Sequence, residues 1–346
     1  MRQPAALLVA SDLDRTLIYS RRALALTVGE QPPLICVEHH RGEGSSFMTA
    51  RAGQLMRDLS AVATVMAVTT RTPEQLDRVR LPGRPHRFAV AANGGLLFID
   101  GQVDAGWSRQ VRGRLAESAS LNEVLTYTGQ ASHQPWMLRL RTVPDLFCYA
   151  EVDRPQLPAD WLLQATEWAA ERGWRVTLHG RKLYWLPRTL TKSAAVREVV
   201  DRIGAGRVLA AGDSSLDIDL LENADLGIHP RHGDLFASGW SAPHVTPTAE
   251  IGVLAGQAIL ERFRTIAQEH AEAQMGCHSG RIHPLRRPQS APGSANRNGR
   301  QIERVVAHPQ QRVGGAGETD GGDPESEALR DAAGHDSGDE PGQVPQ

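Results

Sequence analysis

The sequence predicts an α/β fold: a Rossmann-like parallel sheet core with an inserted α+β cap domain and a disordered C-terminal tail. Three observations lead to this prediction. Short apolar runs alternate with helical patterns near both ends of the folded region. Between about 106 and 186, this alternation changes to a helix followed by two strands, and the unit occurs twice. From about residue 276 onward, the chain has no apolar periodicity and is rich in Gly, Pro, Ser, Gln, Asn and Arg.

These patterns divide the chain into four expected segments. Residues 1–105 and 187–270 form the two parts of the core, residues 106–186 form the cap, and residues 271–346 form the tail. Such a tail cannot bury enough apolar surface to offset its ordering entropy. It is basic in its first half and acidic at its end. Contact of its arginines with nucleic acid or an acidic partner is the alternative to a solvated extension.

Composition excludes several classes of protein. The 346 residues are 40% hydrophobic and 23% charged, which is typical of a globular chain. A formal net charge of −2 gives no basis for nucleic-acid binding that depends on overall basicity. The three cysteines lack metal-like spacing and are too few for a disulfide scaffold. Because we find neither a secretory signal nor an apolar stretch of about 20 residues, we expect a cytoplasmic protein without a membrane span.

The elements of the core follow from periodicity and capping residues. Apolar runs predict buried strands, and spacing of about 3.6 residues predicts helices. Thr49 is a candidate N-cap, and Thr72 with Gln75 fits a capping box with Pro73 at the first helical position. In chain order, we expect a strand at 5–10, a helix at 49–59, strands at 64–68, 88–92 and 96–99, a helix at 192–203, a strand at 208–211, a helix at 216–222, a strand at 226–228 and a helix at 253–266.

The insert has a different pattern. Residues 111–124 and 159–172 show helical spacing, and Gly173 lies just past the end of the second helix. The remaining apolar segments alternate with polar residues or flank a turn at Gly180-Arg181. They predict strands at 137–142, 146–152, 175–178 and 183–186.

Pairs of carboxylates follow two of the expected core strands. Asp12 and Asp14 come directly after the first strand, and Asp213 and Asp217 follow the strand at 208–211. Ligands of open α/β sheets bind at this carboxyl edge. Acids placed together there need a compensating cation. Alone, Asp14 or Asp213 is also compatible with a simple turn or helix cap.

Hydroxyl and ammonium groups are expected at the same edge. Thr69 and Thr70 follow the strand at 64–68, and Lys192 opens a helix. Lys182 and Lys192 are the chain's lysines, against 36 arginines. Lysine in such a chain indicates a position where arginine cannot substitute. Individually these are a turn threonine and a surface lysine; with the acids they form a phosphate site.

The four segments, in this order, resemble the four motifs of the haloacid dehalogenase (HAD) superfamily of phosphohydrolases. The position and size of the insert resemble the type IIB cap branch, which includes Cof-like sugar phosphatases and sucrose-phosphate phosphatase. Asn93-Gly94-Gly95 matches an Asn-Gly turn of these proteins, and the resemblance covers about 5–265. Arg15 and Thr70 stand where glycine is usual, and Leu216 stands where many relatives have asparagine.

The resemblance implies a role for each motif residue. Asp12 would be the nucleophile that forms an aspartyl-phosphate, and Asp14 the acid/base. Thr69, Thr70 and Lys192 would hold the phosphoryl group. Mg²⁺ would be bound by Asp12, Asp213 and the backbone carbonyl of Asp14. Asp217 would support the metal or its waters.

In this branch the cap provides specificity, so the polar cap residues are the tentative substrate contacts. They would suit a polyol or sugar phosphate, although a solvated strand face is the alternative. The leading function is a Mg²⁺-dependent phosphatase of a small phosphorylated metabolite. The alternatives are a phosphomutase similar to phosphomannomutases and a non-catalytic regulatory or binding protein. We expect His39 and His40 to be surface or interface residues and not metal ligands. The cap candidates are Arg139, Arg141, His179, Arg181, Lys182 and Tyr184.

Overall fold

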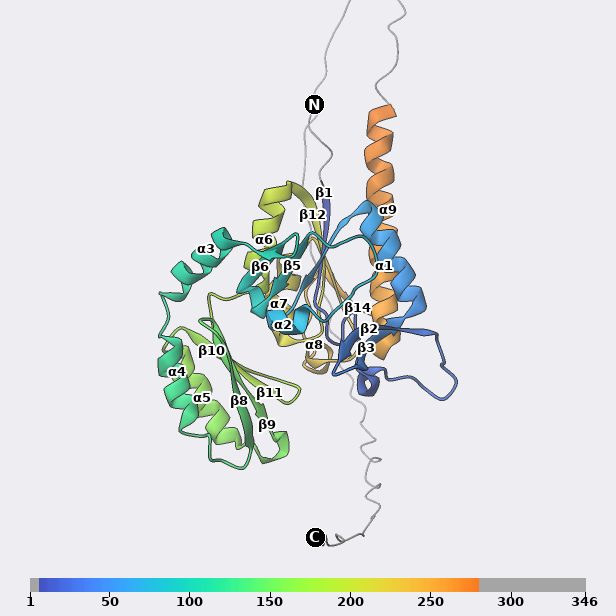
Figure 1. Cartoon of the computed structure of the whole chain (residues 1–346). Helices are drawn as coiled ribbons and strands as arrows, with labels where there is room; N and C mark the ends of the chain where they lie inside the picture. Colours follow the sequence, from blue (N-terminus) through green and yellow to red (C-terminus); the bar gives the residue numbers. More distant parts are fainter. Residues whose placement is uncertain (1–5, 280–346) are drawn as a thin grey trace, which may run out of the picture. The chain divides into compact units, whose positions relative to one another are not determined.

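The computed structural model describes residues 6–279, with side chains up to 274 (Figure 1). Its largest sheet has the strand order β14-β13-β12-β1-β4-β5-β6-β7. Pairing is parallel from β14 to β5, and β6 and β7 continue antiparallel at one edge. The strands are β1 (Ala6–Ser11), β4 (Thr64–Val68), β5 (Phe88–Ala91), β6 (Leu96–Ile99), β7 (Gln102–Val103), β12 (Ala205–Ala211), β13 (Leu226–His229) and β14 (Val245–Pro247).

Helices cover both faces of this sheet, which confirms the predicted α/β core. Successive residues of a strand point to opposite faces. Leu8 and Ala10 of β1 accordingly belong to one apolar cluster, with α6 and α7, while Leu7 and Val9 belong to another, with α1 and α9. Figure 1 shows α1 and α9 side by side. The helices are α1 (Ala50–Val62), α6 (Lys192–Ile203), α7 (Ile218–Glu222) and α9 (Gly252–Ser279).

A second, antiparallel sheet with the order β10-β11-β9-β8 forms the predicted α+β insert. One of its faces packs on helices: Trp185 meets Trp161 edge-on, with ring centroids 6.1 Å apart. The other face carries Tyr149 and Tyr184. The elements are β8 (Met137–Val143), β9 (Phe147–Val152), α5 (Ala159–Ala170), β10 (Trp174–His179) and β11 (Lys182–Pro187).

The prediction of a single helix at 111–124 is wrong. The chain forms α3 (Ala105–Leu115) and α4 (Leu121–Gly129) instead. Ser120 is the reason for the break, because its side chain accepts a hydrogen bond from the Glu123 backbone and so begins a new helix. The helix expected at 216–222 is also divided, into the 3₁₀ turn η4 (Ser215–Asp217) and α7.

Between α1 and the first strand lies a hairpin that no pattern predicted. It consists of β2 (Leu34–His40) and β3 (Glu43–Thr49), paired antiparallel with register shifts. His39 and His40 are exposed at its end, in agreement with the surface position we expected. The remaining short elements are η1 (Arg21–Ala23), α2 (Pro73–Leu76), η2 (Ala92–Gly94), η3 (Arg154–Gln156) and α8 (Asp234–Ala237).

The last described helix is longer than expected. We predicted its end at 266 and a disordered tail over 271–346, but α9 continues to Ser279. The rest of that predicted tail lies outside the described residues. Within residues 6–279, no helix is long and apolar enough to cross a membrane.

Candidate active site

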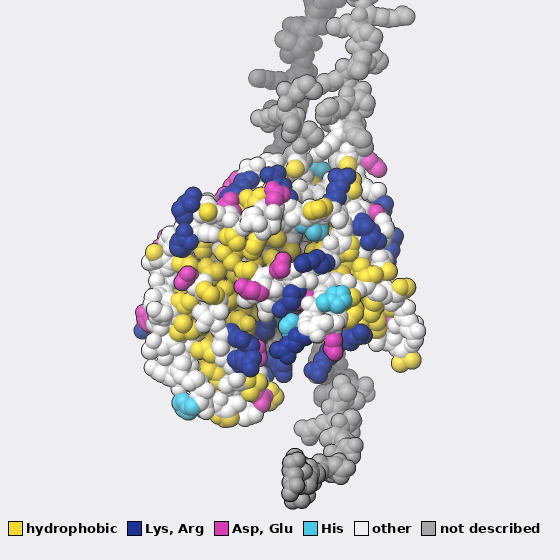
Figure 2. Space-filling model, in the orientation of Figure 1, with side chains coloured by type: hydrophobic (Ala, Val, Ile, Leu, Met, Phe, Trp, Pro, Cys, Tyr) yellow, Lys and Arg dark blue, Asp and Glu magenta, His cyan; other side chains and the backbone are white. Residues whose placement is uncertain are grey.

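The predicted motif residues meet at the carboxyl edge of the large sheet. Asp12 follows β1, Thr69 follows β4, Asp213 follows β12, and Lys192 opens α6. They line a cavity of about 370 Å³ between this edge and the second sheet. Figure 2 shows Lys and Arg side chains gathered near the centre of that view, beside the cap. Cap residues that line the same cavity are Tyr149, Glu151, His179, Arg181, Lys182 and Tyr184.

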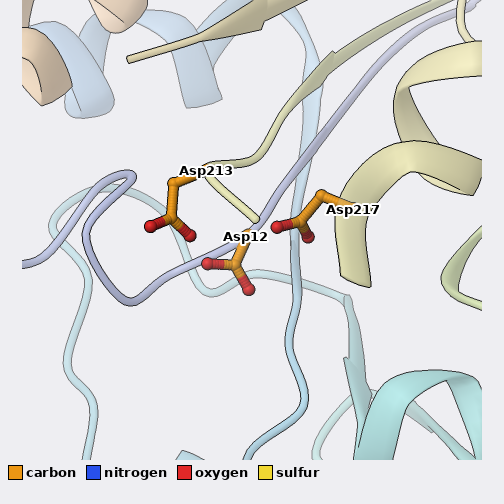
Figure 3. Close-up of side chains that lie close together, drawn as sticks. All are labelled: Asp12, Asp213 and Asp217. Carbon is orange, nitrogen blue, oxygen red and sulfur yellow. The ribbon is translucent and has the colours of Figure 1, made fainter. Parts of the chain in front are cut away.

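Three of the four predicted acids form a buried cluster. Asp12, Asp213 and Asp217 each offer a carboxylate oxygen, and these oxygens lie within 4.8 Å of one another (Figure 3). Burial raises the pKa of Asp12 to about 7, although Lys192 acts in the opposite direction. Burial likewise raises the pKa of Asp213 well above its usual value. The cluster is therefore short of positive charge.

The cluster also has the donor chemistry that a hard divalent cation requires. Carboxylate oxygens are the usual protein ligands of Mg²⁺. Oδ2 of Asp213 is buried and accepts no hydrogen bond within the described structure. The nearest cation is the half-exposed guanidinium of Arg15, whose Nε lies 3.4 Å from that oxygen. An oxygen in this state is available as a metal ligand, so the residues fit Mg²⁺.

Lys192 lies between two of these acids. Its Nζ donates to Oδ1 of Asp12 at 2.7 Å and to Oδ1 of Asp217 at 2.5 Å. Burial alone would lower the pKa of Lys192, but the two carboxylates outweigh burial and raise it. The side chain is only 1% exposed, which excludes the surface lysine that the sequence left open.

Asp217 is held in place by the loop before it. Its Oδ2 accepts hydrogen bonds from the backbone N–H and the hydroxyl of Ser214, at 3.0 and 2.9 Å. Gly212 permits this approach, since a Cβ there would overlap the Asp217 carboxyl group. Both oxygens of Asp217 are thus already hydrogen-bonded, and its contact with Lys192 makes it a supporting residue of the cluster.

The Asn93-Gly94 turn positions the start of α6. The Asn93 amide donates to the carbonyl of Leu190 at 3.1 Å. Gly94 has a φ of +98°, and a Cβ on it would overlap the backbone of Thr191, the N-cap of α6. The turn therefore lies directly against the residue before Lys192.

Asp14 is separated from the acid cluster by its side-chain direction. Its carboxylate accepts two hydrogen bonds from Arg71, from Nε at 2.7 Å and from Nη2 at 2.8 Å. Arg71 in turn donates to Glu38 on β2, at 2.9 and 3.1 Å. The metal contact predicted for Asp14 involves its backbone carbonyl, so this side-chain direction is compatible with it.

The hydroxyl candidates Thr69 and Thr70 follow β4, the strand next to β1 in the sheet. Thr69 is buried, its hydroxyl accepts from the Arg71 backbone N–H at 3.2 Å, and Thr70 beside it is half-buried. Both line the cavity. Thr16, which the sequence analysis did not single out, points its hydroxyl to Oδ2 of Asp12 at 3.5 Å.

Two departures from the motif pattern have structural consequences. Arg15 has a φ of +61°, a region that favours glycine, which explains the usual glycine at this position. Its side chain extends toward Asp213. Leu216 is buried and lines the cavity, so it contributes an apolar surface where an asparagine amide is common.

The cap candidates divide into two groups. His179, Arg181, Lys182 and Tyr184 line the cavity, whereas Arg139 and Arg141 do not. The two arginines lie opposite Glu151 and Tyr149 in the register of β8 and β9, on the cavity-facing side of the sheet. Because β8 is the edge strand, they remain beyond the rim, and Arg141 approaches Glu151 at 4.0 Å.

Sequence reasoning missed several residues that shape the site. Glu38 and Ser46 lie on the unpredicted hairpin, and Asp234 of α8 pairs with His179 at 2.7 Å. Arg71 directly follows Thr70 in the sequence, but no role was predicted for it. No signal in the sequence indicated Glu38. Its unusual feature, a glutamate buried on a strand, is visible only in the structure of the hairpin.

Comparison with known proteins gives structural matches alone. No protein-family model and no curated protein matches the sequence. The sucrose-phosphatase of Synechocystis sp., solved with sucrose and phosphate, matches with a TM-score of 0.54 and 16% identity, over 75% of this chain and 98% of that one. A Thermoplasma acidophilum protein matches with a TM-score of 0.50 and 14% identity, over 75% and 98% of the chains. A Streptococcus mutans protein matches with a TM-score of 0.50 and 10% identity, over 76% of this chain and 99% of that one.

These matches extend across the core and the insert together. At such identities they establish the fold and not the activity. The fold agrees with the motif order found in the sequence, including the insert between the second and third motifs. The chain therefore shares with these proteins a capped fold, in which a mostly parallel α/β core carries an antiparallel insert.

Proposed function

We propose that this protein is a Mg²⁺-dependent phosphatase that hydrolyses a small phosphorylated metabolite through an aspartyl-phosphate. The observation that carries the proposal is the buried cluster of Asp12, Asp213 and Asp217 with Lys192, at the edge of a cavity that the cap encloses. A carboxylate nucleophile, an ammonium group and hydroxyl donors at one point are the groups that phosphoryl transfer requires.

The first step is a displacement at phosphorus. An oxygen of Asp12 forms a bond to phosphorus, and the bond from phosphorus to the leaving oxygen breaks. Asp14 gives its proton to that oxygen, so the product leaves as an alcohol. Thr69 and Lys192 hold the phosphoryl oxygens, and Lys192 also keeps Asp12 oriented through the contact at 2.7 Å.

The second step returns Asp12 to its starting state. Asp14, now a carboxylate, takes a proton from water, and the resulting hydroxide oxygen bonds to phosphorus while the Asp12–phosphorus bond breaks. Inorganic phosphate leaves. Asp12 and Asp213 would hold Mg²⁺ together with the Asp14 carbonyl. When bound, the ion neutralises charge on the phosphoryl group and the carboxylates.

The cap side of the cavity supports a sugar or polyol as the leaving group. The rings of Tyr149 and Tyr184 lie 5.4 Å apart, and Nζ of Lys182 lies 5.4 Å above the Tyr149 ring. Glu151 lies opposite Lys182 in the register of β9 and β11. Aromatic faces beside charged donors and acceptors suit the apolar faces and hydroxyl groups of a polyol. The sucrose bound by the Synechocystis protein is consistent with this class.

Release of inorganic phosphate from a panel of sugar, polyol, nucleotide and lipid phosphates tests the proposal. We expect turnover of a sugar or polyol phosphate, and no turnover by Asp12→Asn at an unchanged or higher unfolding temperature. That substitution removes the nucleophile and one of three crowded acids but no core packing. Conversion of a hexose 1-phosphate to a 6-phosphate without phosphate release would identify the mutase alternative. Activity of Asp12→Asn near that of the unaltered protein would contradict the covalent mechanism.

A further inference from the structure

We infer that Glu38, outside the reacting centre, is a positioning residue: through Arg71 it holds the Asp14 carboxylate in the orientation needed for proton transfer. The inference rests on the proposed phosphatase function and adds a residue that none of the motifs contains. Glu38 does not line the cavity, whereas Arg71 and Asp14 do. Its influence on the reaction must therefore pass through Arg71.

The geometry forms a chain of two bidentate contacts. Arg71 donates Nε and Nη2 to Asp14, at 2.7 and 2.8 Å, and Nη1 and Nη2 to Glu38, at 2.9 and 3.1 Å. A guanidinium donates in a fixed plane, so fixing it on one carboxylate orients the other. Each carboxylate oxygen has two lone pairs, and accepting from Arg71 leaves one on each oxygen of Asp14 for the transferred proton.

Asp14 needs such support because its own surroundings do not fix it. Its side chain is 50% exposed, against 4% for Glu38 and 12% for Arg71. An exposed aspartate changes rotamer freely, and a small displacement of a catalytic group costs much of its rate. The buried members of the chain thus supply the rigidity that the exposed member lacks.

Glu38 is itself fixed by the hairpin and by the segment after the second motif. Ser46 on β3 donates to its Oε2 at 2.6 Å, and Arg78 donates to its Oε1 at 3.2 Å. The backbone of β2 is bonded to the same segment, from Arg80 N–H to the carbonyl of Val37 at 2.7 Å. Burial opposes ionisation of Glu38, but the hydrogen bonds from Arg71, Ser46 and Arg78 outweigh it and lower its pKa to about 2.

The test exploits the different need of two leaving groups for a proton. An alkyl phosphate, such as the sugar phosphate found in the panel, requires proton donation when its bond to phosphorus breaks. The leaving group of p-nitrophenyl phosphate departs without a proton. Single-turnover release of each leaving group, with enzyme in excess, isolates this first step from the hydrolysis that follows.

Glu38→Gln should slow release of the sugar about 100-fold, within the usual contribution of general acid catalysis, and slow release of p-nitrophenol less than about fivefold. In an Asp14→Asn background, Glu38→Gln should cause no further loss, because its effect passes through Asp14. Glu43→Gln is the matched control, the same change at an exposed position of the same hairpin, and should behave like the unaltered protein. If Glu38→Gln does not fold, Glu38→Asp, which keeps the charge but shortens the reach, should show the same difference between substrates.

Equal losses on both substrates would overturn the inference, since they indicate a general structural effect. A loss from Glu38→Gln that persists in the Asp14→Asn background would overturn it as well. Failure of the proposed function looks different, because the unaltered protein would then release neither leaving group.

Discussion

Lys192 combines two properties that a surface lysine does not have. It is almost completely buried, and its ammonium group contacts two carboxylates. Without that charge, Asp12, Asp213 and Asp217 would be three neighbouring buried acids, and each would resist ionisation. Lys192 therefore favours the ionised form of Asp12 and limits the rise in the pKa of Asp12 that burial causes.

Lys192→Arg should lower turnover by two orders of magnitude or more, although it preserves the charge. A guanidinium fork is broader than an ammonium group, and there is no space for it between oxygens 2.7 and 2.5 Å from Nζ. Overpacking of this buried position should also destabilise the protein by about 1–3 kcal/mol. Steady-state kinetics and thermal unfolding measure the two effects.

Lys182→Arg is the matched comparison, since Lys182 is the chain's other lysine. It is half-buried above the Tyr149 ring, where a longer planar group can be accommodated. If Lys182 contacts only the part of the substrate remote from the reacting phosphorus, as we propose for the cap, Lys182→Arg should change mainly KM. Small and equal effects of the two substitutions would show that Lys192 is not in the phosphate site.

At the scale of elements, an ion pair at the tip of the β10–β11 hairpin joins the cap to the core beside the cavity. Nδ1 of His179 lies 2.7 Å from Oδ2 of Asp234 on α8. Burial would lower the pKa of His179, but the bond to Asp234 and nearby carboxylates outweigh burial and raise it. The charged pair thus ties the cap sheet to α8, whose Leu235 backbone N–H donates to the carbonyl of Asp213 at 3.2 Å.

This pair predicts a pH-dependent contribution to stability. A histidine whose pKa is raised on folding stabilises the protein fully below its ordinary value of 6.5, and the contribution disappears as pH rises through the raised value. Unfolding temperatures in metal-free buffer should therefore separate the unaltered protein from His179→Gln at pH 6 and converge at pH 9. Partial exposure of both groups limits the difference in stability to about 1 kcal/mol.

His133→Gln, at an exposed cap position, is the control and should show no such trend with pH. A difference in unfolding temperature between the unaltered protein and His179→Gln that widens toward pH 9 would contradict the stabilising role of the His179–Asp234 pair.

For the whole molecule, the sequence predicted what depends on local periodicity and missed what depends on pairing at a distance. The strand at 64–68 and the helix at 192–203 have the predicted bounds. The helix has them because Thr191 caps its start and Gly204 ends it in a left-handed conformation. The hairpin of β2 and β3 was missed, since its register shifts break the alternation on which strand prediction relies.

The same distinction applies to the site. Residues at strand ends, such as Asp12 and Asp213, could be placed together because parallel strands end at one edge of a sheet. The contact between Glu38 and Arg71 could not, because it joins the hairpin to the second motif and leaves no periodic signal. The cap arginines Arg139 and Arg141 were predicted as tentative substrate contacts, and the strand order places them on the edge strand β8, outside the lining of the cavity.

Mg²⁺ should stabilise the folded chain as well as support its activity. The proposed ligands Asp12 and Asp213 follow β1 and β12, which are far apart in the sequence, so the assembled site exists only in the folded state. A cation that binds the folded state alone stabilises it by about 2.7 kcal/mol at a concentration of 100 Kd. The unfolding temperature should rise with Mg²⁺ concentration, and turnover should stop in EDTA. Ca²⁺ should inhibit, since its higher coordination number favours bidentate capture of the nucleophilic carboxylate.

Asp213→Asn separates this site from other acids of the chain. It should abolish both the thermal shift and the turnover, because it removes the buried oxygen that accepts no hydrogen bond. Asp160→Asn, at an exposed position in the first turn of α5, should retain both. An undiminished thermal shift in Asp213→Asn would mean that Mg²⁺ binds elsewhere. Full turnover of the unaltered protein in EDTA would show that the reaction does not depend on the metal, and the crowded acids would then need another source of positive charge.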